Sequence, residues 1–111
     1  FADVDPQTFN IDPNDIRKKI TTKTKAIITV SLYGLSPEMD QIMEIARQHG
    51  LKVVEDNAQC VLGQYKGQIV GSLGDISIFS LQRSKHLTTG DGGMLITNNN
   101  PVCIRRSGSA P

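Results

Sequence analysis

The sequence predicts an α/β fold, a mostly parallel sheet with flanking helices. An apolar, β-branched run at residues 26–32 is followed by an amphipathic helical pattern at 36–50 and by a second apolar run at 52–54. Two strands joined by a helix are expected to be parallel and connected by a right-handed crossover. The length of 111 residues suits one domain with a single modest core.

The N-terminal residues predict the end of a strand and then a short helix. Residues 1–4 form a short apolar alternation that runs into an Asp-Pro pair, which favours a turn. We expect Asp12 to cap the helix, because its carboxylate can accept a backbone N–H of the first turn. Pro13 suits the first helical position, and the helix is expected to run to about Ile20.

The next residues build the strand and helix of the predicted βαβ unit. The run at 26–32 has the composition of a strand covered on both faces and should end at Tyr33–Gly34. Ser36 is expected to cap the following helix, with Pro37 inside its start and Gly50 closing it. One stripe of this helix is apolar: Met39, Ile42, Met43, Ile45 and Ala46.

The second half of the chain predicts further strands and a glycine-rich connection. Residues 52–54 begin a buried strand, and the four glycines within 63–74 indicate a loop or a small hairpin. The last two strand candidates are 76–81 and 94–97, separated by the glycine-rich turn at 90–93.

Composition and charge exclude several classes of protein. A hydrophobic content of 38% with 21% charged residues is ordinary for a folded domain, and a net charge of +1 does not favour nucleic acid or an anionic membrane as a partner. The uncharged stretch at 26–37 is too short to span a bilayer, and no export signal is recognised, so we expect a cytoplasmic protein. Cys60 and Cys103 match no disulfide framework or metal-ligand spacing and are expected to be free thiols, so no metal site is predicted.

Three polar segments follow predicted strand ends: Tyr33–Gly34, 55–59 and 80–85. Ligands of open parallel sheets bind at the carboxyl ends of the strands, where these loops converge. We therefore expect the three segments to meet in one cleft.

Two charged residues in these segments leave alternatives open. Glu55 and Asp56 should point to opposite faces of their strand, and Asp56 either caps a following helix or faces a cationic group. Lys85 is a solvated surface lysine, a phosphate ligand beside the glycine-rich turn, or an amine that forms a Schiff base. Spacing alone does not decide between these readings.

Several motifs together resemble the DegT/DnrJ/EryC1/StrS aminotransferases, a family that depends on pyridoxal 5′-phosphate. They are VVEDNAQ at 53–59, YKGQIVGSLGDISIFS at 65–80 and SKHLTTGDGGMLIT at 84–97. Members of this family are much longer than 111 residues. The resemblance therefore implies that residues 1–98 are a central fragment of a fold-type-I large domain that binds the cofactor. Residues 99–111 depart from the family pattern and are expected to form an irregular tail.

The resemblance also implies roles for single residues. Asp56 matches the aspartate that pairs with the protonated pyridine nitrogen, and Gln59 matches the glutamine or histidine near the phenolic oxygen. Ser80 matches a serine that hydrogen-bonds the cofactor phosphate. Lys85 matches the catalytic lysine that forms the internal aldimine and then transfers a proton. Asn57 stands where the family usually has alanine.

The function implied by the resemblance is transamination of a nucleotide-linked keto-sugar, with glutamate or glutamine as the amino donor in a ping-pong reaction. The longer enzyme is expected to be a homodimer, and the isolated chain is expected to be inactive. Some relatives carry histidine in place of the lysine and dehydrate their substrate, so Lys85 favours transamination. Two alternatives are a receiver-like signalling module without enzymatic activity and an inert remnant of a truncated gene.

Overall fold

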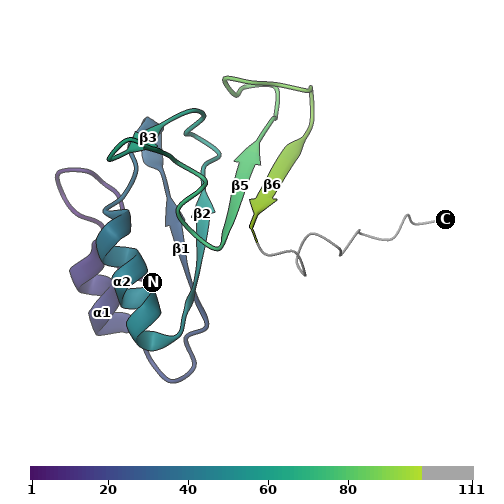
Figure 1. Ribbon diagram of the computed structural model, residues 1–111. Helices are drawn as coiled ribbons and strands as arrows, with labels where there is room; N and C mark the ends of the chain where they lie inside the picture. The colour runs from purple at the N-terminus through teal and green to yellow at the C-terminus, as the bar shows by residue number, and fades with distance from the viewer. Residues whose placement is uncertain (99–111) are drawn as a thin grey trace.

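A four-stranded sheet forms the body of the molecule in the computed structural model, which describes residues 1–98 (Figure 1). Its strand order is β1-β2-β5-β6; β1, β2 and β5 run parallel, and β6 runs antiparallel to β5. This arrangement confirms the predicted α/β class and mostly parallel sheet, and the expected irregular tail at 99–111 lies outside the described residues. The strand bounds are β1 Ala26–Val30, β2 Lys52–Asp56, β3 Gln64–Tyr65, β4 Gln68–Ile69, β5 Ile76–Ser80 and β6 Gly93–Thr97.

Two helices, α1 (Pro13–Lys19) and α2 (Met39–His49), lie together on one side of the sheet (Figure 1). The start of α1 is as predicted, because the Asp12 carboxylate accepts the backbone N–H of Asn14 at 2.8 Å and Pro13 occupies the first turn. The helix ends one residue before the expected position.

The start of α2 corrects the prediction that Ser36 caps this helix. The Ser36 hydroxyl instead donates to the carbonyl oxygen of Pro37 at 3.1 Å, and Glu38 occupies the cap position without a side-chain hydrogen bond. The carbonyl oxygen of Glu38 accepts the backbone N–H of Ile42 at 3.1 Å, so the helix begins at Met39, two residues later than a cap at Ser36 would give. Gly50 ends the helix as predicted, in the left-handed conformation with φ of 63°.

The hydrophobic core lies between the helices and one face of the sheet. Only this face of β1 is buried: Ile27 is 6% exposed, whereas Ile28 is 64% exposed. The expectation that this strand is covered on both faces is therefore wrong for the described chain. The strand also ends at Val30, because residues 32–34 form the short 3-10 helix η1. The core side chains are Ile16, Ile27, Met39, Ile42, Ile45, Ala46 and Val53.

The N-terminal segment is not the strand end that the sequence predicts. Within residues 1–4, only Val4 pairs, in an isolated antiparallel bridge with Ile11. The chain reverses between them because the Asp5 carboxylate accepts backbone N–H groups of the turn, among them that of Thr8 at 3.0 Å.

The glycine-rich connection at 63–74, predicted to be either a loop or a small hairpin, contains a small hairpin. Strands β3 and β4 pair antiparallel and contact the start of α2. The Tyr65 hydroxyl donates to the Glu38 carboxylate at 3.1 Å, and Lys66 forms an ion pair with Asp40. These contacts hold the hairpin against the helix.

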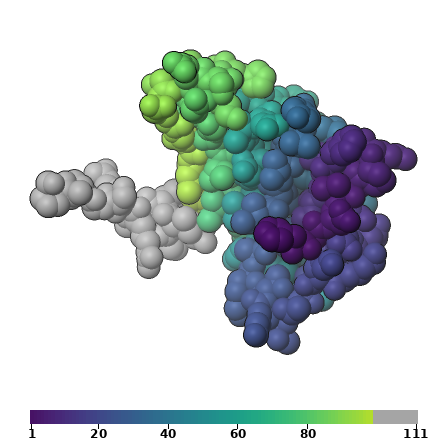
Figure 2. Space-filling model, turned by 180° about the vertical axis from the view of Figure 1, so that it is seen from behind, coloured from purple at the N-terminus to yellow at the C-terminus, as the bar shows by residue number. Residues whose placement is uncertain are grey.

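The two outer strands of the sheet each have one neighbour within the described residues. Strand β1 pairs only with β2 there, and β6 pairs only with β5. The loop that connects β5 to β6 projects beyond the sheet (Figure 2). Across residues 1–98, no helix is long and apolar enough to cross a membrane.

Candidate active site

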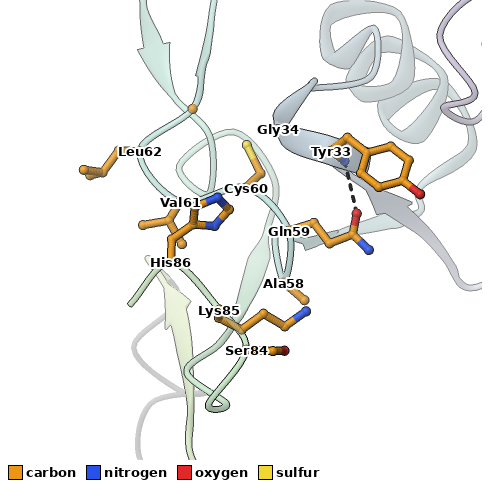
Figure 3. Close-up of a pocket in the computed structure, with 11 residues that line it drawn as sticks. Tyr33, Gly34, Ala58, Gln59, Cys60, Val61, Leu62, Ser84, Lys85 and His86 are labelled. Carbon is orange, nitrogen blue, oxygen red and sulfur yellow. Dashed lines mark hydrogen bonds between the residues drawn. The ribbon is translucent and has the colours of Figure 1, made fainter. Parts of the chain in front are cut away.

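A cavity of about 460 Å³ lies at the carboxyl ends of β1, β2 and β5 (Figure 3). Its walls come from the loop after each of these strands, so the predicted meeting of three polar segments is confirmed. The volume is within the range of small-molecule sites in proteins. The lining residues are Tyr33, Gly34, Ala58, Gln59, Cys60, Val61, Leu62, Gly63, Ser84, Lys85 and His86.

Two of the predicted site residues, Gln59 and Lys85, line this cavity. Lys85 is half-buried, and its backbone N–H donates to the carbonyl oxygen of Gln82 at 2.9 Å, which folds the loop after β5 into a turn. Gln59 follows β2, and its side-chain oxygen accepts the backbone N–H of Tyr33 at 3.1 Å. Both side chains extend from their loops into the same region (Figure 3).

Asp56 is the last residue of β2 and is half-buried. Its carboxylate accepts the backbone N–H of Ala58 at 3.0 Å, closing a turn. No helix follows Asp56 within the described chain, so the alternative in which it caps a helix is wrong. Asp56 lies at the cavity's edge of the sheet but is not among the residues lining the cavity.

Ser80 is the last residue of β5, one strand away from Asp56. Asp56 pairs with Ile78 in the sheet, and Ser80 lies two residues further along, so Asp56 and Ser80 share one face. The Ser80 hydroxyl accepts the backbone N–H of Gln82 at 3.4 Å. The structure thus brings Gln59 and Lys85 into one cavity and places Asp56 and Ser80 at neighbouring strand ends outside its lining.

Glu55 points to the opposite face from Asp56, as predicted, and has a structural role. Its side chain is 1% exposed and accepts three backbone N–H groups from the loop before β5. The donors are Gly71 at 2.7 Å, Leu73 at 2.8 Å and Gly74 at 2.5 Å. Three hydrogen bonds to a carboxylate compensate for its loss of water, so Glu55 fixes this loop beneath the sheet.

Residues 60–63 form a cavity wall that the sequence analysis missed. Cys60 is buried, which raises the pKa of its thiol, and the charge of Glu55 adds to the increase. A Cβ atom at Gly63 would lie 2.3 Å from the Cys60 sulfur, so a larger residue there would displace the buried Cys60 side chain. The glycine was visible in the sequence, but its proximity to the Cys60 sulfur was not.

Asn57 ties the end of β2 to β5. Its side chain is fully buried, and its amide nitrogen donates to the Ser77 hydroxyl at 2.8 Å. Its amide oxygen has no hydrogen-bond partner among residues 1–98. The residue that departs from the family's usual alanine is therefore a buried structural contact between the two strands.

Comparison with known proteins decides the family. The sequence model of the DegT/DnrJ/EryC1/StrS aminotransferase family matches residues 1–105. The chain belongs to this family.

Curated relatives in this family are much longer than the chain. A "Pleiotropic regulatory protein" of Geobacillus stearothermophilus is 47% identical over 117 residues, which cover all of this chain and 32% of the relative. A GDP-perosamine synthase of Escherichia coli O157:H7 is 48% identical over 105 residues, covering 95% of this chain and 29% of the relative. The chain thus spans about a third of the length of these relatives.

Solved structures agree with this assignment. An aminotransferase from Psychrobacter cryohalolentis matches with a TM-score of 0.87 and 46% identity over 89% of this chain and 25% of that protein. GDP-4-keto-6-deoxy-D-mannose-3-dehydratase of E. coli, solved with bound hydrated pyridoxal phosphate, matches with a TM-score of 0.82 and 32% identity over the same shares. These matches confirm the predicted fragment of a fold-type-I large domain and leave the receiver-like alternative without support.

Proposed function

We propose that the longer protein containing this chain is a pyridoxal-phosphate-dependent aminotransferase of a nucleotide-linked keto-sugar. The observation that carries the proposal is the position of Lys85 and Gln59 in one cavity at the carboxyl edge of the sheet. Asp56 and Ser80 end the two neighbouring strands at the same edge. The family relationship supports the reaction class, and GDP-perosamine synthase among the relatives supports the class of sugar substrate.

The donor set fits the cofactor. When bound, pyridoxal phosphate supplies an aldehyde for covalent attachment and a ring that withdraws electrons. Lys85 provides the amine for attachment, Asp56 a carboxylate for the protonated ring nitrogen, and Ser80 a hydroxyl for the phosphate. Gln59 provides an amide for the ring oxygen.

The environment of Lys85 leaves its side chain available to the cavity. Its Nζ has no hydrogen-bond or ion-pair partner within residues 1–98, and the side chain is half-buried at the cavity wall. Because no carboxylate among residues 1–98 holds the side chain elsewhere, Nζ can turn toward a molecule bound in the cavity. We propose that Lys85 moves the proton for both substrates in turn, first for a glutamate or glutamine donor and then for the keto-sugar.

We propose that the isolated chain lacks activity. Two apolar hollows, of about 600 and 550 Å³, flank the sheet beside the outer faces of β1 and β6, and exposed side chains such as Ile28 and Met94 line them. Apolar surfaces of this kind favour a cover, and the chain spans only about a third of its relatives. The homodimer of the full-length enzyme stays a prediction from the resemblance.

Reductive labelling tests the role of Lys85. The full-length protein is incubated with pyridoxal phosphate, reduced with borohydride and digested, and the modified lysine is located by mass spectrometry. We expect the label on Lys85 and its loss in Lys85→Ala, whereas Lys66→Ala, which removes an exposed, ion-paired lysine, keeps the label. A label spread over several lysines, or absent from Lys85, contradicts the proposal.

A separate measurement tests the alternative that the chain is an inert remnant of a truncated gene. A cooperative thermal transition of the chain, followed by circular dichroism, would speak against an inert remnant. A gradual change without a transition would support it.

A further inference from the structure

Tyr33 has a backbone conformation that is unusual for a residue with a side chain. Its φ is 50°, in the left-handed region, which is unfavourable for a residue other than glycine. Such backbone persists only where the surroundings fix it, and it is frequent at functional sites. Tyr33 lies on the cavity wall, in η1 between β1 and α2 (Figure 3).

The turn around Tyr33 is held on both sides. The backbone N–H of Leu32 donates to the side-chain oxygen of Asn10 at 3.1 Å. The backbone N–H of Leu35 donates to the carbonyl oxygen of Leu32 at 3.0 Å, which closes η1. These contacts set the direction of the Tyr33 N–H, which points at Gln59.

The contact between Tyr33 and Gln59 determines how the amide of Gln59 is oriented. A backbone N–H can only donate, so it must meet the oxygen of the amide and not its nitrogen. Gln59 Oε1 accepts this N–H at 3.1 Å, and the dashed line in Figure 3 marks the contact. Nε2 then keeps both of its hydrogens for donation, since it has no hydrogen-bond partner within residues 1–98.

We propose that the left-handed backbone of Tyr33 is a positioning element that fixes Gln59 as a hydrogen-bond donor in the cavity. This inference rests on the proposed function, in which Gln59 faces the ring oxygen of the cofactor. If the cofactor were attached to Lys85, which lines the same cavity, an Nε2–H donated to the ring oxygen would withdraw electron density from it and lower the proton affinity of Lys85 Nζ. A reversed amide would present its oxygen and have the opposite effect.

Two variants at position 33 separate the backbone from the aromatic ring. Tyr33→Val and Tyr33→Asn both remove the ring, but asparagine tolerates the left-handed region and a β-branched residue does not. The probe is the pH titration of the absorbance of pyridoxal phosphate bound to the full-length protein. We expect the midpoint of Tyr33→Val to lie above that of Tyr33→Asn by roughly 0.5 to 1 pH unit, the loss of part of one hydrogen bond to a charged group. Equal midpoints in the two variants overturn the inference.

A second measurement does not depend on the folding of Tyr33→Val. Amide hydrogen exchange of the full-length protein is compared with that of Gln59→Leu, which removes the acceptor of the Tyr33 N–H. We expect exchange at Tyr33 to accelerate severalfold while exchange at Leu32, whose N–H is held by Asn10, stays unchanged. Unchanged exchange at Tyr33 overturns the inference.

The outcomes distinguish this inference from the proposed function. If pyridoxal phosphate gives no absorbance band with the full-length protein, the proposed function fails. If the band forms and titrates but Tyr33→Val and Tyr33→Asn have the same titration midpoint, only the role proposed for the Tyr33 backbone fails.

Discussion

The two faces of the sheet differ in what they do for the chain. On the helix side, Ile27 and Val53 are buried against α2. On the opposite side, Ile28, Val30 and Ile78 are 64%, 40% and 37% exposed. At β1 and β2, one face therefore packs into the core and the other stays exposed. At β6, Met94 and Ile96 lie on the helix-side face and are nevertheless 45% and 40% exposed. Asp56 and Ser80 belong to the second face, so two of the four predicted site residues end strands on the exposed face, while Gln59 and Lys85 lie in the loops beyond the strand ends.

The same division separates two neighbouring carboxylates. Glu55 is buried on the helix side and accepts three backbone N–H groups, whereas Asp56 on the open side is half-buried and accepts one. Strand geometry alone assigns them to different faces. Of these two adjacent acids, Glu55 is a structural residue and Asp56 is a candidate functional residue.

The largest effect is expected for Glu55→Ala. The substitution leaves the N–H groups of Gly71, Leu73 and Gly74 without their buried acceptor, so the free energy of unfolding should fall by about 4 kcal/mol. Urea unfolding of the full-length protein measures it. Glu44→Ala, at a partly exposed position on α2, is the control and should change stability by less than about 0.5 kcal/mol. If Glu55→Ala lowered the free energy of unfolding as little as Glu44→Ala, the structural role of Glu55 on the helix-side face would be contradicted.

A smaller effect is expected for Ile28→Ala in the full-length protein. If further polypeptide covers the open face there, removing this side chain should destabilise by about 2 kcal/mol, approaching the value for Ile42→Ala in the core. The same urea unfolding measures both variants. A loss below about 0.5 kcal/mol at Ile28, with a large loss at Ile42, would mean that the face stays open to solvent.

The smallest effect is expected at Asp75, at the opposite edge of the sheet from the cavity. Burial opposes ionisation of this carboxyl, but hydrogen bonds from Lys52 Nζ at 2.7 Å and from the backbone N–H of Val53 at 2.9 Å outweigh burial and hold its pKa below the ordinary value. Asp75→Asn should destabilise by about 1 kcal/mol at pH 7, because the charge-assisted contact with Lys52 is lost.

The pH dependence of this difference checks its origin. A lowered pKa in the folded state gives stability that is present above the pKa of the unfolded chain, about 3.9 for aspartate, and that is lost as the pH falls through the folded-state pKa. The difference in the free energy of unfolding between the unsubstituted protein and Asp75→Asn should therefore be smaller at pH 3 than at pH 7. A difference that does not change with pH would exclude the charge of Asp75 as its cause.

Much of the fold could be predicted because its signals are local. The cap at Asp12 and the left-handed glycine at Gly50 depend only on residues within one helical turn, and both are confirmed. The strand, helix and second strand followed from the change in hydrophobic period. The cap at Ser36 was wrong although a proline follows it just as Pro13 follows Asp12: the Ser36 hydroxyl donates to the Pro37 carbonyl oxygen, and the helix begins after Glu38.

Burial and site geometry depended on distant residues and could be predicted only in part. A strand rich in isoleucine predicts two covered faces, yet residues 1–98 bury only one face of β1. The meeting of three loops followed from the rule for parallel sheets, but the contact from Tyr33 to Gln59 joins residues 26 positions apart and depends on a left-handed backbone. Nothing in the residue types at those positions indicates that conformation.

The outer strands have a practical consequence for anyone who produces this segment alone. Strands β1 and β6 each have one partner within the described residues, so peptide groups along their free sides can bond to another molecule. Apolar side chains beside both strands would strengthen such pairing. A preparation of the segment should therefore form larger species as its concentration rises, and light scattering over a dilution series would reveal them.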